Sequence, residues 1–251
     1  MKIQTKFHQA IKFSPLSNPN FNQIEESVIF FVNTDQFSED EVLAYNRILT
    51  ESEREVASRF RFLRDRNSYI VTHAILRIIL GNHFETEPTS IEFKTNFFGK
   101  PSVQMNSRDI HFNLSHSSGL SALAFSDQSE VGIDIERIDP EFDFDLIVNT
   151  QFSEKESRYL KAVEPDPRKT FYILWTRKEA ILKTLGTGIG ENLDIEVFRD
   201  KNFCNSENLL PAFGNKNYFL STFIVLEDYI VTIAAEKDVN FTYKTINLLE
   251  P

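Results

Sequence analysis

Residues 131–136 alternate strictly between apolar and polar or small side chains, in the order Val-Gly-Ile-Asp-Ile-Glu. A period of two is typical of a strand with one packed face, so Ile133 and Ile135 belong to that face. Asp134 and Glu136 then point to the opposite side. Two carboxylates this close repel each other, and a bound Mg2+ or Mn2+ ion, which prefers oxygen ligands, would offset the repulsion. An exposed polar strand face is the alternative that this stretch alone leaves open.

The first third of the chain begins with residues that disfavour regular structure and continues with helical patterns. Residues 1–26 contain two prolines and many Asn and Ser residues, which predicts irregular structure. A serine or threonine followed three residues later by glutamate predicts helix starts at Ser38 and Thr50. A longer helix is predicted over residues 64–80, and we expect Gly81 to end it.

Short apolar runs predict strands, and further helices lie between them. The expected strands are 28–32, 91–94, 102–104, 111–114, 120–125, 131–136, 193–198, 218–225 and 229–234. The expected helices after the carboxylate strand are 142–148, 153–162 and 168–185, and Gly186 is expected to end the last of them.

Two short motifs recur in the same order in both halves of the chain. The sequence Gln-Phe-Ser-Glu occurs at 36–39 and at 151–154, and Ala-Ile-Leu followed by a cation occurs at 74–77 and at 180–183. Each long helix is followed by strands. The repetition predicts an α+β fold of two similar subdomains in tandem, with a ligand site near their junction.

We place the boundary between these subdomains after residue 128. The N-terminal subdomain is then 1–128, and the C-terminal subdomain is 129–251. Because one chain of this kind already supplies both sides of a junction site, we expect a monomer.

Composition narrows the class of protein. The chain has 251 residues, of which 41% are hydrophobic and 25% charged, a balance typical of soluble globular proteins. Its single cysteine, Cys204, rules out a disulfide within the chain. The N-terminus lacks an apolar signal core, and no apolar run reaches membrane-span length, so we expect a cytoplasmic protein that does not bind membranes.

The net charge of −10 disfavours a nucleic-acid partner, since phosphate contacts need a basic surface. One basic cluster nevertheless occurs between residues 54 and 66, and it fits a small, phosphate-rich ligand. The alternative is that these arginines pair with nearby acids on solvated helix faces. The cluster comprises Arg54, Arg59, Arg61, Arg64 and Arg66, and the nearby acids are Glu51, Glu53, Glu55 and Asp65.

The helix predicted over 168–185 carries candidate chemistry. Glu179 and Lys183 are four residues apart and therefore share one helix face, and Lys178 lies beside Glu179. An ordinary surface ion pair is one interpretation. The other is that Glu179 completes a three-carboxylate metal site with the two acids of the carboxylate strand, and that the lysines face phosphates held by the metal.

Two further places offer groups that bind phosphate. Ser115 and His116 follow a predicted strand and precede a turn of small residues, where backbone N–H groups, a hydroxyl and an imidazole could hold a phosphate. Lys100 lies beside a turn containing Gly99 and Pro101. A structural histidine and a solvated loop lysine are the alternatives. A serine hydrolase is disfavoured, because the chain lacks a Gly-x-Ser-x-Gly motif.

Taken together, five motifs in this order resemble the 4′-phosphopantetheinyl transferase superfamily, specifically its surfactin-synthetase-activating type. The resemblance spans roughly residues 53–190. Its motifs are Phe98-Gly-Lys-Pro101, Phe112-Asn-Leu-Ser-His-Ser117, Val131-Gly-Ile-Asp-Ile-Glu136, Phe152-Ser-Glu-Lys-Glu156 and Trp175-Thr-Arg-Lys-Glu-Ala-Ile-Leu-Lys183.

The resemblance implies a reaction and a fold. A serine of an apo acyl or peptidyl carrier protein would attack the pyrophosphate of coenzyme A, accept the 4′-phosphopantetheine arm and release adenosine 3′,5′-bisphosphate, with Mg2+ bound. The two subdomains would be related by pseudo-twofold symmetry, with the active site at their interface. The N-terminal subdomain would hold the nucleotide side of coenzyme A, and the C-terminal one the metal acids and catalytic helix.

The resemblance also assigns roles to residues. Asp134, Glu136 and Glu179 correspond to the metal-binding acids, Glu179 also to the general base, and Lys183 to the lysine that assists the leaving phosphate. The residues that correspond to coenzyme A contacts are Lys100, Pro101, Ser115, His116, Lys178 and Lys183. Residues 142–160 correspond to the carrier-docking surface.

In one place the sequence departs from the family pattern. Glu53, Val56 and Ser68 stand where many family members carry the cations that hold the 3′-phosphate. This departure leaves open a non-catalytic homologue that only binds coenzyme A. An Mg2+-dependent phosphohydrolase is a further alternative to a transferase.

Overall fold

The described residues fall into two compact units, each assembled from segments that are distant in sequence. The computed structural model describes residues 2–8, 14–15, 24, 26–105, 108–162, 167–187, 197, 204–205 and 218–246. The first unit comprises Met1–Ile11, Asn96–Lys100 and Gln128–Val239, and the second comprises Lys12–Thr95, Pro101–Asp127 and Asn240–Pro251. Both units combine a sheet with one long helix, which confirms the predicted α+β class of two similar subdomains.

The first unit is built on a five-stranded sheet in the order β8-β11-β10-β1-β9. Neighbouring strands are antiparallel except β1 and β10, which are parallel. The strands are β8 (Val131–Arg137), β11 (Tyr229–Ala235), β10 (Tyr218–Val225), β1 (Lys2–His8) and β9 (Cys204–Asn205). The helices are α4 (Asp145–Gln151), α5 (Glu154–Ala162) and α6 (Pro167–Leu185).

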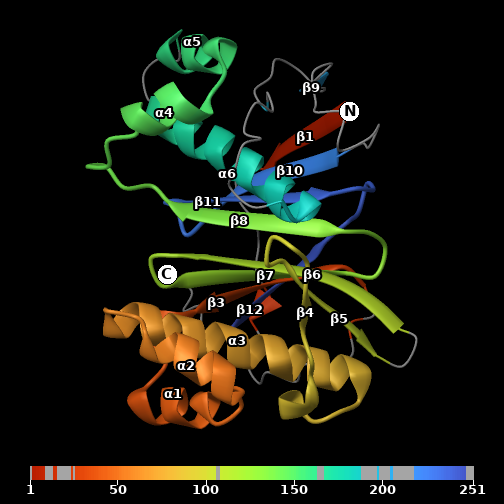
Figure 1. Ribbon diagram of the computed structural model, residues 1–251. Coiled ribbons are helices and arrows are strands. Elements are labelled where there is room, and N and C mark those ends of the chain that lie inside the picture. The colour runs from red at the N-terminus through yellow and green to blue at the C-terminus, as the bar shows by residue number, and fades with distance from the viewer. Residues whose placement is uncertain are drawn as a thin grey trace. The chain divides into compact units, whose positions relative to one another are not determined.

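Helix α6 packs along the sheet of the first unit, over β8, β11 and β10 (Figure 1). Its buried side chains Phe171, Leu174 and Ile181 form a core with residues of β10 and β11. The ring of Phe171 also stacks on those of Phe144 and Phe152, which fixes the segments around α4 against the long helix.

The second unit is built on a seven-stranded sheet in the order β2-β12-β3-β7-β6-β5-β4. Strand β12 runs parallel to β2 and β3, and the remaining pairs are antiparallel. The strands are β2 (Ser14–Pro15), β12 (Thr242–Ile246), β3 (Val28–Asn33), β7 (Leu120–Ser126), β6 (Arg108–Ser117), β5 (Pro101–Met105) and β4 (Lys94–Thr95).

Three α-helices and two short 3₁₀ turns complete the described part of the second unit. They are α1 (Glu39–Asn46), α2 (Glu51–Ser58), α3 (Leu63–Phe84), η1 (Thr34–Gln36) and η2 (Pro88–Ser90). Ser38 and Thr50 form the two predicted capping boxes at the starts of α1 and α2. Helix α3 contributes a nearly continuous buried face, including Ile75 and Ile79, to the core of this unit.

Two sequence-based expectations for the first 95 residues were wrong. The first 26 residues contain β1 and β2 rather than only irregular structure, because pairing with the distant strands β10 and β12 organises them. Gly81 does not end α3, which continues to Phe84 and stops at Glu85 in the left-handed conformation. Gly81 instead allows a close approach: a Cβ atom there would lie 2.9 Å from the carbonyl oxygen of Thr86.

The remaining differences are small. The strand expected at 91–94 is reduced to Lys94–Thr95, and the helix expected from residue 142 begins at Asp145. The strand expected at 193–198 lies outside the described residues except for Val197. None of the helices in the described ranges is sufficiently long and apolar to cross a membrane.

Candidate active site

Strand β8 places Asp134 under helix α6. The predicted alternation of faces is confirmed, because Asp134 lies opposite Thr232 of β11, whose hydroxyl bonds that of Thr176 on α6 at 2.9 Å. The alternative of an exposed polar strand face does not hold for Asp134, which is only 4% exposed. The cause is the close approach of α6: a Cβ atom on Gly132 would lie 2.2 Å from the carbonyl oxygen of Ala180. Glycine permits this contact because it lacks a side chain.

Lys183 brings a cation to this strand. Its Nζ atom lies 2.7 Å from Oδ1 of Asp134, in a pair whose lysine side chain is 28% exposed and whose aspartate side chain is 5% exposed. The predicted proximity of the helix face to the carboxylate strand is therefore present in the structure. A charge-assisted hydrogen bond of this kind is stronger than one between neutral groups, so it fixes the ammonium beside β8.

Glu179 is the electrostatically exceptional group of the site. The residue is 5% exposed, and within the described part of the chain its Oε1 atom is buried without a hydrogen-bond partner. Burial raises the pKa of the Glu179 carboxyl to about 7, and the negative charges of Asp134 and Glu136 add to the rise, while Lys183 opposes it. The three carboxylates are thus close enough to interact.

The same three acids are the residues that the sequence predicts as metal ligands. Within the described ranges, no group of three or more His, Cys, Asp or Glu side chains is arranged so that it could hold one. Lys183 bonds one of the carboxylates directly. The chemistry of the donors nevertheless fits Mg2+: all are carboxylate oxygens, and the buried oxygen and raised pKa of Glu179 mark a place where added positive charge would be favourable.

Lys178 and Lys100 occupy other positions in the first unit. The Nζ atom of Lys178 is fully buried, 2.9 Å from Oε2 of Glu156 and over the ring of Phe152. The Nζ atom of Lys100 lies 2.5 Å from Oε2 of Glu130. Both lysines therefore have protein carboxylates as partners, and the coenzyme A contacts predicted for them stay predictions.

Ser115, His116 and Pro101 belong to the second unit. Ser115 and His116 are consecutive residues within β6, which continues to Ser117, so their side chains point to opposite faces. Ser115 is 7% exposed, whereas His116 is exposed. A phosphate bound on one face of β6 could therefore contact the side chain of Ser115 or that of His116, but not both. Pro101 is partly exposed at the start of β5.

The hairpin that follows these residues is fixed by an ion pair. Ser118 and Gly119 both have positive φ, 45° and 83°, as the two central residues of the tight turn between β6 and β7. Arg64 donates to the carbonyl oxygen of Ser118 at 2.9 Å and to the carboxylate of Asp35. Arg64 of the basic cluster thus pairs with a residue outside its own helix. Glu53 likewise pairs with Arg77, at 2.8 Å, rather than with a cluster arginine.

Two family models match the chain in succession. Residues 36–128 match the model described as 4′-phosphopantetheinyl transferase, N-terminal, and residues 130–234 match the 4′-phosphopantetheinyl transferase superfamily model. The chain belongs to the 4′-phosphopantetheinyl transferase superfamily. It is therefore a transferase by descent, and the superfamily model covers Asp134, Glu136, Glu179 and Lys183.

Curated members of the 4′-phosphopantetheinyl transferase superfamily align over most of the chain. The 4′-phosphopantetheinyl transferase HetI of Nostoc sp. is 31% identical over 183 residues, covering 71% of this chain and 77% of that protein. A 4′-phosphopantetheinyl transferase of Bacillus subtilis is 30% identical over 199 residues, covering 78% and 85%. Sfp of Bacillus subtilis strain 168 is 31% identical over 159 residues, covering 62% and 69%.

Sequence reasoning missed two partner residues in this transferase. Glu156 belongs to the Phe152–Glu156 motif, and its position three residues after Ser153 is the same capping-box spacing that predicts the starts of α1 and α2. Glu130 directly precedes the carboxylate strand and offered no signal, because its partner Lys100 is thirty residues away.

Proposed function

We propose that the protein transfers the 4′-phosphopantetheine arm of coenzyme A to a serine hydroxyl of an apo acyl or peptidyl carrier protein, with Mg2+ bound, and releases adenosine 3′,5′-bisphosphate. One observation carries the proposal. In a chain of this superfamily, a buried glutamate with a pKa raised to about 7 lies beside a carboxylate strand and a lysine.

The charged groups of the first unit suit the steps of this reaction. A base works best when its pKa is near the working pH, so Glu179 is suited to accept the proton of the carrier serine. Lys183, with its ammonium on Asp134, is suited to stabilise the negative charge that develops on the leaving phosphate. A Mg2+ ion held by Asp134, Glu136 and Glu179 would neutralise charge on the pyrophosphate.

Coenzyme A and the carrier need further surfaces. We assign the nucleotide side of coenzyme A to Ser115, His116 and Pro101 of the N-terminal subdomain, 1–128, as the family resemblance implies. Residues 142–160 are assigned to carrier docking. Exposed apolar side chains support that assignment: Leu146 is 74% exposed, Phe142 38% and Tyr159 37%.

We further predict a coenzyme A contact for Lys178, a pseudo-twofold relation between the subdomains and an active site at their interface. A monomeric state and a cytoplasmic location are predictions as well. Size-exclusion chromatography with light scattering tests the monomer directly, because a dimer would have twice the mass of 29.1 kDa.

The decisive test is mass spectrometry of a panel of apo-carriers after incubation with the protein, coenzyme A and Mg2+. One phosphopantetheine per carrier is expected, together with adenosine 3′,5′-bisphosphate. Glu136→Ala is expected to lose transfer while remaining folded, because Glu136 is partly exposed near the end of β8. Binding of coenzyme A without transfer to any carrier would favour the non-catalytic homologue, and phosphate release without a carrier would favour the phosphohydrolase.

A further inference from the structure

All three N–H donors of the Lys100 ammonium have protein acceptors. The Nζ atom lies 2.5 Å from Oε2 of Glu130, 3.2 Å from the carbonyl oxygen of Val131 and 3.1 Å from the carbonyl oxygen of Thr184. The lysine side chain is 14% exposed. Since an ammonium has three donors and no acceptor, this arrangement leaves none for a phosphate without breaking a bond within the first unit.

The acceptors connect Lys100 to the end of the catalytic helix. Thr184 lies in the last turn of α6, directly after Lys183, where backbone carbonyl groups lack partners within the helix. Asn96 supplies a second bond, because its Nδ2 atom donates to the carbonyl oxygen of Gly186 at 2.9 Å. The segment Asn96–Lys100 therefore caps α6 from a distant part of the chain, and a cation at a helix C-terminus also complements the helix dipole.

The turn that carries this cap is held in shape by its own bonds. The side-chain oxygen of Asn96 accepts from the backbone N–H groups of Phe98 at 3.0 Å and of Lys100 at 2.9 Å. Gly99 has a φ of 88°, which favours glycine. Gly186 leaves room for the contact, since a Cβ atom there would lie 2.6 Å from Nδ2 of Asn96 and 3.1 Å from Cδ of Lys100.

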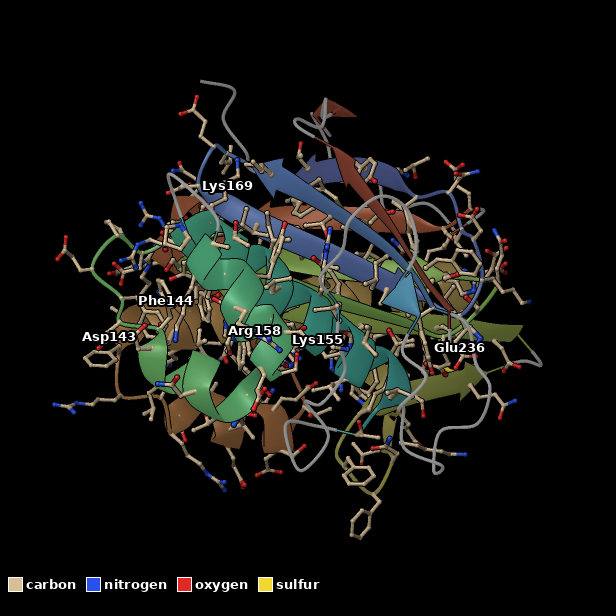
Figure 2. All side chains as sticks on the ribbon, turned by 90° about the horizontal axis from the view of Figure 1, so that it is seen from above. Asp143, Phe144, Lys155, Arg158, Lys169 and Glu236 are labelled. Atoms are coloured by element: carbon tan, nitrogen blue, oxygen red, sulfur yellow. The ribbon has the colours of Figure 1, made fainter. Side chains whose placement is uncertain are left out.

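The surroundings of Lys100 are rich in negative charge. The backbone N–H group of Glu236 donates to the carbonyl oxygen of Glu130 at 3.3 Å, so these two acids are neighbours next to the end of β11 and the start of β8. Glu236, labelled in Figure 2, directly follows β11. Burial raises the pKa of the Tyr218 hydroxyl, and the charges of Glu236 and Glu130 add to the rise. Lys100 brings positive charge to this pair of acids and to the negative end of α6.

We propose that Lys100 is a positioning residue that holds the C-terminal turn of α6, and with it Lys183 and Glu179, against β8. This inference rests on the proposed function for its catalytic consequence only. It differs from the coenzyme A contact that the family resemblance implies for Lys100, because the ammonium bonds α6 and β8 in the protein itself. The cap acts before any substrate binds.

The test compares Lys100→Met, Glu130→Gln and the double variant with the wild type and with Lys94→Met. Lys94 is an exposed lysine of β4 in the neighbouring segment and serves as the matched control. Without coenzyme A, Lys100→Met is expected to lower Tm by about 5 °C. It should also speed amide hydrogen exchange in the last turns of α6. The double variant should recover part of the loss, because removing the Glu130 charge relieves the repulsion that Lys100 had offset.

Kinetics separate positioning from substrate contact. Lys100→Met is expected to lower kcat about tenfold, with the KM for coenzyme A changed less than twofold, because misplaced catalytic groups slow the chemical step. An unchanged Tm and exchange rate together with a tenfold higher KM would overturn the proposal and make Lys100 a coenzyme A ligand. If the wild type transfers nothing, the proposed function fails, yet the Tm and exchange measurements still decide whether the cap exists.

Discussion

The two long helices of the molecule are anchored in the same way but carry different charges. In the first unit, Glu156 of α5 pairs with Lys178 of α6 at 2.9 Å. In the second, Glu53 of α2 pairs with Arg77 of α3 at 2.8 Å. Each glutamate is also the N3 residue of a capping box, so one carboxylate both caps a short helix and pairs with the long helix beside it.

The difference lies in the charges beyond this shared pair. The Arg77 guanidinium is satisfied within its unit by Glu53 and by the carbonyl oxygens of Pro88 and Ile91, both at 3.0 Å. Helix α6 adds Glu179 and Lys183, which face the acids of β8. The shared pairs hold the long helices in place. Glu179 and Lys183, which α6 carries in addition, are the charged groups on which the proposed function depends.

Removing the buried cation of α6 is expected to have the largest effect on stability. Lys178→Met leaves the Glu156 carboxylate uncompensated in a pair that is 0% exposed on both sides, which should cost about 3–5 kcal/mol in the free energy of unfolding. Arg77→Met should cost less, because the Glu53 side chain is 14% exposed. Urea unfolding of both variants measures the difference. Equal stability of Lys178→Met and the wild type would contradict the anchoring role given to the Glu156–Lys178 pair.

The next largest effect is expected in the pH dependence of stability, to which Glu179 of the first unit should contribute. The Glu179 pKa is about 7 in the folded state against 4.5 ordinarily, so the folded state binds the proton more tightly. Stability should therefore fall as pH rises between these values, by on the order of 3 kcal/mol in total. Glu179→Gln should remove this dependence. Thermal unfolding at several pH values provides the measurement, and parallel curves for the two proteins would show that Glu179 does not titrate as described.

Two glycines near the long helices provide a smaller comparison. Gly132→Ala forces a Cβ atom against the backbone of α6 and should cost about 1–3 kcal/mol. At Gly81 the helix interior gains about 1 kcal/mol from alanine, which offsets much of the clash with Thr86. Circular-dichroism melting of both variants tests this order, and a larger loss for Gly81→Ala would contradict the packing described for β8 and α6.

Local signals predicted most of the elements. The strand expected at 218–225 has those bounds in the structure, and both N-terminal capping boxes are present. Pairing between distant strands could not be predicted from local patterns. Strand β1 was therefore not predicted, because its parallel partner begins at Tyr218. A glycine near the end of a helical pattern can either end the helix or lie within it, and the sequence does not distinguish the two. Gly186 has a φ of 70° and follows α6, whereas Gly81 lies inside α3 to allow a close contact.

The sequence predicted which side chains of the candidate site lie near one another, but not their burial or their bonding partners. The alternation around Asp134 and the four-residue spacing of Glu179 and Lys183 predicted that these side chains lie on elements that face each other, and β8 and α6 do. The burial of Asp134 and the partner of Lys100 depend on how closely α6 approaches β8 and on a segment joined from elsewhere in the chain. Neither the burial of Asp134 nor the partner of Lys100 can be predicted from the local sequence pattern.

The most direct test of the catalytic role of the first unit is single-turnover transfer to an apo-carrier by the wild type, Glu179→Gln and Arg77→Met, each corrected for its folded fraction. Glu179→Gln is expected to slow transfer by about 10²–10⁴-fold, with Tm unchanged or raised, because a buried, repelled carboxylate becomes neutral. Arg77→Met is expected to lower Tm and to keep the rate per folded molecule. Transfer by Glu179→Gln at nearly the wild-type rate would contradict the account.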